Sequence, residues 1–191
     1  MAKDINPGSL SSSPQHLVAM GTTIYMSANA GTTHGTELYA YEITNNSAWL
    51  VADIRGGAAG SSPSDIVILG TQVYLQATSG THFEMWVYES QNNSIREVTD
   101  IQSTSGANGP TELTVYQYTV YFSANDGTTG KELWAHNSIN ETTWQVIDLH
   151  PNGGYIGDIH VHEGDVYFAG EDNRDGRELW RLIFSKDVSF V

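Results

Sequence analysis

The sequence predicts an all-β fold, a four-bladed β-propeller with four antiparallel strands per blade, formed by residues 1–191 as a single domain. Three observations predict this fold. A Glu-Leu-Trp-like motif occurs four times, at Glu37, Glu84, Glu132 and Glu178, with spacings of 47, 48 and 46 residues. Strand-like sequences separated by polar turns fill every copy, and no stretch has the 3.6-residue apolar period of a helix. A four-stranded unit of this length in tandem is typical of a propeller blade.

The four copies share one order of elements. Each opens on an Asp followed by Ile or Leu, which sets repeats of approximately 4–52, 53–99, 100–147 and 148–191. A loop rich in Gly, Ser and Pro then leads to a short apolar strand and to a second strand centred on Tyr25 or its equivalent. A polar turn, the Glu-Leu-Trp strand, another polar turn and a fourth strand complete the copy. The short polar turns predict antiparallel hairpins.

The number of periods bears on how the blades close. The chain holds nearly four whole periods, which favours a closed ring, although head-to-tail assembly into a larger ring gives the same count. The break falls between the last strand and the loop that enters the first copy. We therefore expect closure by noncovalent packing, and either a monomer or a swapped or head-to-tail oligomer.

Composition excludes several classes of partner. The chain has no cysteine, so any metal must be bound by oxygen or imidazole ligands. Its net charge of −14 repels nucleic acid and anionic membrane surfaces. No apolar run approaches the length of about 18 residues that predicts a membrane helix, and the first residues lack the apolar stretch of a secretory signal. We expect neither a nucleic-acid partner nor membrane insertion.

One set of polar residues predicts a cation site. These residues directly precede the apolar position of the first strand in each copy, and they are His16, Asp65, Glu112 and Asp158. The first strand of a propeller blade lines the central channel, so three carboxylates and one imidazole could form a ring there. Such a ring suits Ca²⁺ or another hard cation. The alternative is that these side chains simply face solvent at the channel mouth.

Two tryptophans are the candidate ligand-binding residues. Trp86, Trp134 and Trp180 share one repeat position with Tyr39, and core packing is their expected role. Trp49 and Trp144 instead lie in the last strand of their copies, where they are freer to stack on a sugar ring.

Three other polar patterns favour structural roles. The acidic turn at residues 171–176 has part of the spacing of a calcium loop but is expected to be an ordinary turn. His160 and His162 alternate on one strand, and the other copies lack histidines there, so a packed or solvated pair is expected over a metal pair. Acceptor sequons begin at Asn45, Asn92 and Asn140, which places those hairpin turns in solvent.

The chain resembles the ELWxxDGT repeat family, whose hyalin-like tandem β repeats occur in secreted bacterial proteins. The resemblance rests on Asp4-Ile5-Asn6-Pro7-Gly8 with Ser12-Ser13-Pro14, and on the run from Asn125-Asp126-Gly127-Thr128 to Glu132-Leu133-Trp134. It implies an adhesion or binding module with an extracellular or cell-surface location. The Asp-Gly-Thr that often follows Glu-Leu-Trp in that family is replaced here by residues such as Ala40-Tyr41-Glu42.

Three functional hypotheses follow. The first is a noncatalytic binding or adhesion module, lectin-like, with a glycan or other small ligand between blades and an axial cation. The second is a glycan-processing enzyme in which two channel-mouth carboxylates, such as Asp65 and Glu112, act as acid and base. The third is a purely structural repeat domain. Most of the conspicuous residues recur in every copy, which favours binding or structure over catalysis.

Overall fold

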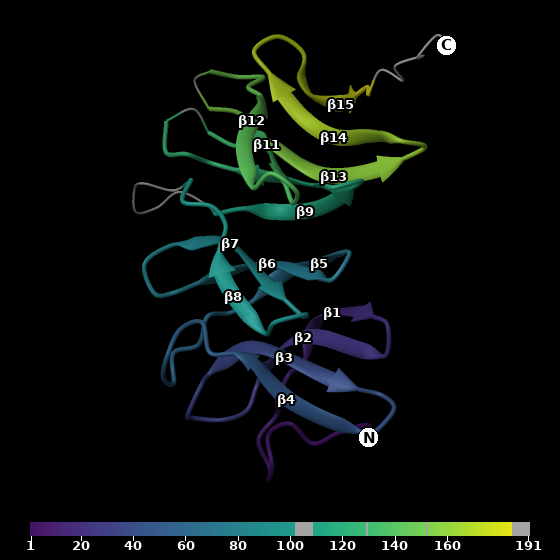
Figure 1. The fold of residues 1–191 in the computed structure, drawn as a ribbon. Helices are drawn as coiled ribbons and strands as arrows, with labels where there is room; N and C mark the ends of the chain where they lie inside the picture. Colours follow the sequence, from purple (N-terminus) through teal and green to yellow (C-terminus); the bar gives the residue numbers. More distant parts are fainter. Residues whose placement is uncertain (102–108, 129, 152, 185–191) are drawn as a thin grey trace, which may run out of the picture.

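The protein is described here by a computed structural model that covers residues 1–101, 109–128, 130–151 and 153–184. Throughout these residues the regular elements are β-strands, arranged in four antiparallel sheets, which we call blades 1 to 4. The blades follow one another in chain order as a row (Figure 1). The prediction of an all-β, propeller-like fold is confirmed.

The strands are as follows. Blades 1 and 2 contain β1 (Gln15–Met20), β2 (Thr23–Asn29), β3 (Thr36–Glu42) and β4 (Ser47–Ala52), then β5 (Ser64–Leu69), β6 (Gln72–Thr78), β7 (Phe83–Glu89) and β8 (Ser94–Glu97). Blades 3 and 4 contain β9 (Thr111–Tyr116), β10 (Thr119–Ala124), β11 (Glu132–Asn137) and β12 (Thr142–Ile147), then β13 (Ile156–His162), β14 (Asp165–Asp172) and β15 (Gly176–Leu182).

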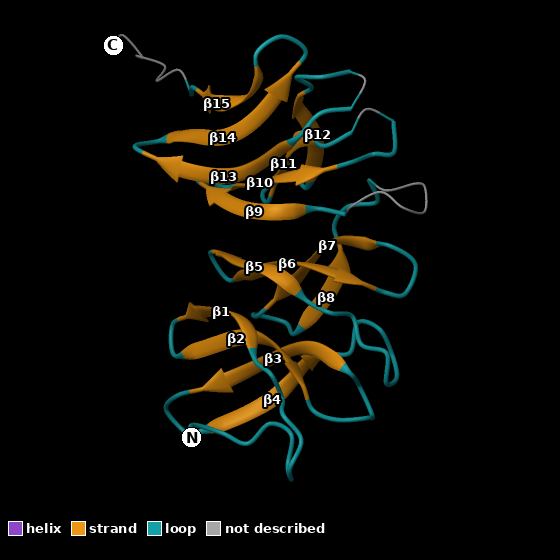
Figure 2. Cartoon of the chain, turned by 180° about the vertical axis from the view of Figure 1, so that it is seen from behind, coloured by secondary structure: helices purple, strands orange, loops and turns teal. Residues whose placement is uncertain are grey.

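Within each blade the spatial order of the strands is their order in the sequence, as expected for successive hairpins (Figure 2). Blades 1 to 3 have the four strands that the repeat predicts. In blade 4 the structure describes three strands, and the predicted fourth falls on residues 185–191, outside the described part of the chain.

The first strand of every blade carries a β-bulge. Its register against the second strand shifts between Gln15 and Val18 in blade 1, and at the matching place in the other three blades. The residue in the bulge has a positive φ each time, between 47° and 61°. A bulge bends the strand and increases its twist, so one local device recurs in all four blades.

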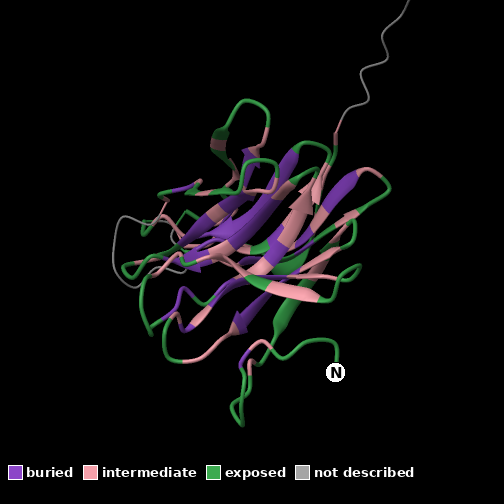
Figure 3. Cartoon of the chain, turned by 60° about the horizontal axis from the view of Figure 1, so that its bottom comes forward, coloured by how far each residue is buried: buried purple, intermediate pink, exposed green. Residues whose placement is uncertain are grey.

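The apolar core lies between the blades. Three clusters of buried side chains join blade 1 to blade 2, blade 2 to blade 3, and blade 3 to blade 4. The buried residues follow the middle of the strands and the exposed ones the turns (Figure 3). Each sheet is thus covered by its neighbours rather than by helices.

Closure of the four blades into a ring is not observed. The first strands contact in sequence, β1 with β5, β5 with β9, and β9 with β13. Within the described residues, no comparable interface joins blade 4 back to blade 1, and Figures 1 and 2 place these blades at opposite ends of the row. The number of repeats sets how many blades form. The packing of side chains at each interface sets the angle between blades, and here that angle leaves the row open.

Candidate functional site

The repeated glutamate of the third strand is a structural anchor. Glu37 lies at the start of β3 and is fully buried. Its carboxylate accepts hydrogen bonds from the backbone N–H groups of Ile54, Arg55 and Ser61, and from the Ser61 hydroxyl at 2.5 Å. Burial raises the pKa of Glu37, while these hydrogen bonds act in the opposite direction. The carboxylate thereby fixes the linker that leads from blade 1 to blade 2.

The equivalent residue in blade 2 has the same role. Glu84 is buried and accepts hydrogen bonds from the Thr99 hydroxyl at 2.9 Å and from the Ile101 N–H at 3.4 Å. In blade 4, Glu178 is exposed instead. In blades 1 and 2 the repeated carboxylate therefore holds the linker to the next blade, as expected for a recurring structural residue.

The four candidate metal ligands are the bulge residues of the first strands, His16, Asp65, Glu112 and Asp158. Asp65 is half-buried, and the other three are exposed. Among the described residues, which include all four, no group of three or more His, Asp or Glu side chains lies close enough to hold a metal ion. In the open row the predicted axial ring is therefore not assembled within one chain.

Trp49 and Trp144 occupy equivalent places on the outermost strands. Trp49 on β4 lies opposite Ala40, and Trp144 on β12 lies opposite Ala135. Each tryptophan has 40% of its surface exposed. Since Ala40 and Ala135 pack toward the following blade, both indoles lie on the face of their sheet that is turned toward that blade.

The same position in blade 2 is occupied by Arg96, opposite Val87 on β7. The Arg96 guanidinium forms an ion pair with Glu141 of blade 3. This contact shows that a side chain at this fourth-strand position can reach the next blade. The sequence alone did not single out Arg96, because its equivalence to Trp49 and Trp144 follows from the register of the strand pairs.

Two further tryptophans have structural hydrogen bonds. The indole N–H of Trp86 donates to the Ala77 carbonyl at 3.2 Å, and that of Trp180 donates to the Gly170 carbonyl at 3.0 Å. Both side chains are half-buried against the core clusters. Their predicted packing role fits this geometry.

The polar turns behave as turns. Asp172 ends β14, and its carboxylate accepts hydrogen bonds from the backbone N–H groups of Arg174 and Asp175, which lower its pKa. The side chains of Asn45, Asn92 and Asn140 accept hydrogen bonds from the backbone N–H two residues later. These Asx-type bonds stabilise tight hairpin connections and keep the turns exposed.

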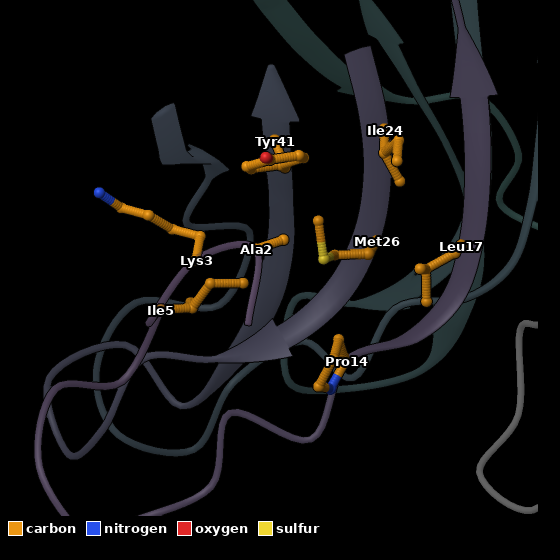
Figure 4. Close-up of a pocket in the computed structure, with 8 residues that line it drawn as sticks. All are labelled: Ala2, Lys3, Ile5, Pro14, Leu17, Ile24, Met26 and Tyr41. Carbon is orange, nitrogen blue, oxygen red and sulfur yellow. The ribbon is translucent and has the colours of Figure 1, made fainter. Parts of the chain in front are cut away.

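Two pockets lie beside the blades. A polar pocket of about 270 Å³ on blade 2 is lined by His82, Glu84, Glu97 and Asp100, among others, and burial together with Glu84 and Asp100 raises the pKa of Glu97. An apolar pocket of about 280 Å³ lies on the free face of blade 1 (Figure 4). Its lining includes Leu17, Ile24, Met26 and Tyr41, with the N-terminal segment on one side.

Known proteins share the fold of this chain without close sequence similarity. No family model and no curated protein match the sequence. Many solved structures match its fold, and three of them illustrate the likeness. A puromycin-hydrolyzing peptidase of Mycobacterium tuberculosis is 11% identical, with a TM-score of 0.53 over 83% of this chain and 25% of that chain. TolB from Acinetobacter baumannii is 8% identical, with a TM-score of 0.56 over 84% and 38%. A chain of a nidogen–laminin complex is 9% identical, with a TM-score of 0.51 over 84% and 73%.

The chain spans a quarter of the peptidase, less than half of this TolB and about three quarters of the chain in the nidogen–laminin complex. No helix in the described part of the chain is long and apolar enough to cross a membrane. At these identities the likeness concerns the fold alone. TolB is a β-propeller, and this chain has a propeller-like fold.

Proposed function

We propose that this protein is a noncatalytic binding module, and that Trp49 and Trp144 contact its ligand from the outer strands of their blades. The observation that carries the proposal is the equivalence of the two residues, which share one repeat position, one orientation and one degree of exposure. A partly exposed indole offers a flat apolar face with a polar N–H, and such side chains are enriched at binding interfaces.

The ligand class that suits this geometry is carbohydrate. A sugar ring has an apolar face that can lie on an indole and hydroxyls that can bond to polar groups at the rim. Two equivalent tryptophans suit a ligand with repeating units, because each can hold one unit and the combined affinity exceeds that of either contact alone. The resemblance to secreted repeat proteins supports an extracellular or cell-surface location for such a module.

A protein ligand is the second candidate. The neighbour from the nidogen–laminin complex was solved with a protein partner. Tryptophan and arginine are the residues most enriched among energetically dominant interface contacts, and Trp49, Arg96 and Trp144 share one repeat position. The same three residues would then contact the partner.

The experiment compares the wild type with Trp49→Ala, Trp144→Ala and the double variant on an array of neutral and acidic oligosaccharides, followed by calorimetric titration of the best binder. Each single variant should bind at least about tenfold more weakly, and the double variant should not bind. Tyr118→Ala removes an exposed aromatic ring elsewhere and should bind normally. Unchanged binding in the double variant would contradict the proposal.

The remaining hypotheses have direct tests on the same material. Release of reducing sugar from a bound polysaccharide, abolished by Asp65→Asn or Glu112→Gln, would replace the binding function by glycan processing. Calcium binding by the bulge residues stays a prediction, and a melting temperature that falls with chelator would support it.

A further inference from the structure

The three interfaces between blades are copies of one pattern. Each blade presents to the next a forward face built from the central-strand tyrosine and from the first and third residues after the repeated glutamate. These forward-face residues are Tyr25, Leu38 and Ala40 in blade 1, Tyr74, Met85 and Val87 in blade 2, and Tyr121, Leu133 and Ala135 in blade 3. All nine are buried.

The opposite side of each blade is a backward face that packs on the preceding blade. It contains an apolar residue of the first strand and two of the second, which are Ile66, Val73 and Leu75 in blade 2, Leu113, Val120 and Phe122 in blade 3, and Ile159, Val166 and Phe168 in blade 4. These residues are also buried, none with more than 9% of its surface exposed.

Within the part of the chain that the structure describes, the forward face of blade 4 is not covered by another blade. Its equivalent residues are Tyr167, Leu179 and Arg181. Leu179 is 77% exposed, whereas Leu38, Met85 and Leu133 are completely buried. Arg181 is paired with Asp165 and lies 5.7 Å from the centre of the Tyr167 ring, so its charge would keep a partner if this face were covered.

Among the described residues, no other blade covers the backward face of blade 1. Its equivalent residues are Leu17, Ile24 and Met26. Leu17 is 59% exposed and Ile24 is half-buried, whereas Met26 is buried in a small cluster within blade 1 against which Ile5 of the N-terminal segment packs. These three residues line the apolar pocket with Tyr41 (Figure 4). The pocket is thus the vacant half of an interface whose other half recurs three times in the same chain.

We propose that the forward face of blade 4 binds the backward face of blade 1 in a second copy of this chain, so that two copies associate head to tail into a ring of eight blades. The occupant is inferred from the chain itself, because each covered backward face is covered by a forward face of the same design. Heterologous contacts of this kind form closed rings when the rotation permits, and eight is the upper end of the usual blade number, so two copies complete a ring.

The repeat also predicts one residue contact in this assembly. At two interfaces the forward-face tyrosine lies beside a ring of the following blade. That ring belongs to the residue four positions after the repeated glutamate of that blade. The ring centroids are 5.9 Å apart for Tyr25 and Tyr88 and 5.8 Å apart for Tyr74 and His136. At the free faces these positions are Tyr167 and Tyr41. Tyr167 of one copy should therefore lie against Tyr41 of the other.

The test is the mass of the protein in solution, measured by light scattering and sedimentation over a wide concentration range. The wild type should have twice the 20.9 kDa mass of one chain. Leu17→Asp and Leu179→Asp should each be monomeric, with melting curves that show a folded chain, because both positions are exposed in the single chain. Ile139→Asp, an equally apolar exposed position on the β11–β12 turn, should stay dimeric.

Mixing distinguishes a head-to-tail interface from a symmetric one. Leu17→Asp retains its forward face and Leu179→Asp retains its backward face, so the mixture should form a heterodimer through one intact interface. A heterodimer absent from the mixture, or a wild type that is monomeric at all concentrations, would overturn the proposal. Assemblies of more than two copies would contradict the two-copy ring.

Since the chain has no cysteine, Tyr41→Cys mixed with Tyr167→Cys should couple with a short bismaleimide, and neither variant should couple alone.

Discussion

At the scale of single residues, the buried carboxylate of Glu37 explains how one repeat connects to the next. It accepts hydrogen bonds from the N–H groups of Ile54 and Ser61 in the linker, and the Ser61 N–H also donates to the Thr36 carbonyl, so these backbone groups keep hydrogen-bond partners. The residue belongs to the connection between blades and not to any reaction.

Replacing Glu37 by Ala should lower the free energy of unfolding by about 2–4 kcal/mol, because the buried Ser61 hydroxyl and the N–H groups of Ile54 and Arg55 lose their acceptor. Urea denaturation followed by tryptophan fluorescence measures this. The matched control is Glu178→Ala, at the equivalent but exposed position of blade 4, which should change stability by less than about 0.5 kcal/mol. Equal losses in the two variants would contradict a linker-anchoring role.

At the scale of elements, the bulge in the first strand is the recurring device. His16, Asp65, Glu112 and Asp158 occupy it with positive φ, a conformation that Asp and His tolerate better than most residues. Their polar character follows from this backbone requirement as readily as from metal binding. The sequence pattern that predicts a cation ring is thus also the pattern of a bulge.

A pair of substitutions at Glu112 separates the backbone from the side chain. Glu112→Val should cost about 1–2 kcal/mol in unfolding free energy, because a β-branched residue is strained at a φ of 61°. Glu112→Gly should be as stable as the wild type or more so, since glycine adopts this conformation freely. Denaturant midpoints measure both, and a valine variant as stable as the glycine variant would show that the bulge imposes no such strain.

At the scale of the whole molecule, an open row of blades with a net charge of −14 repels itself and its copies. Salt should therefore stabilise the fold. Raising NaCl from about 0.02 M to about 0.5 M at neutral pH should increase the unfolding free energy in urea, since the Debye length falls several-fold. The effect should disappear near pH 4.6, the isoelectric point of the sequence. The measurement uses the Leu17→Asp variant, so that association between copies does not contribute to the stability. An unfolding free energy that falls as salt is added would contradict the prediction.

The candidate ligand residues show how far sequence reasoning reached. Trp49 and Trp144 were identifiable because they fall outside the repeated Glu-Leu-Trp position. The face of the blade on which they lie was not, because it depends on the pairing of β4 with β3 and of β12 with β11. Arg96 was recognised as the equivalent residue of blade 2 only from its pairing with Val87 on β7 and from its ion pair with Glu141 of the next blade.

The sequence by itself determined the number of repeats, the order of strands in each and the turns that join them. These properties are local, since alternating apolar residues, turn residues and a constant spacing act within a single blade. Only the tertiary structure decided that the four blades form an open row. The angle between blades arises from many side chains packed across each interface, and no period in the sequence encodes it. That angle is what leaves Leu17 and Leu179 exposed at the two ends of the row, although their equivalents elsewhere are buried.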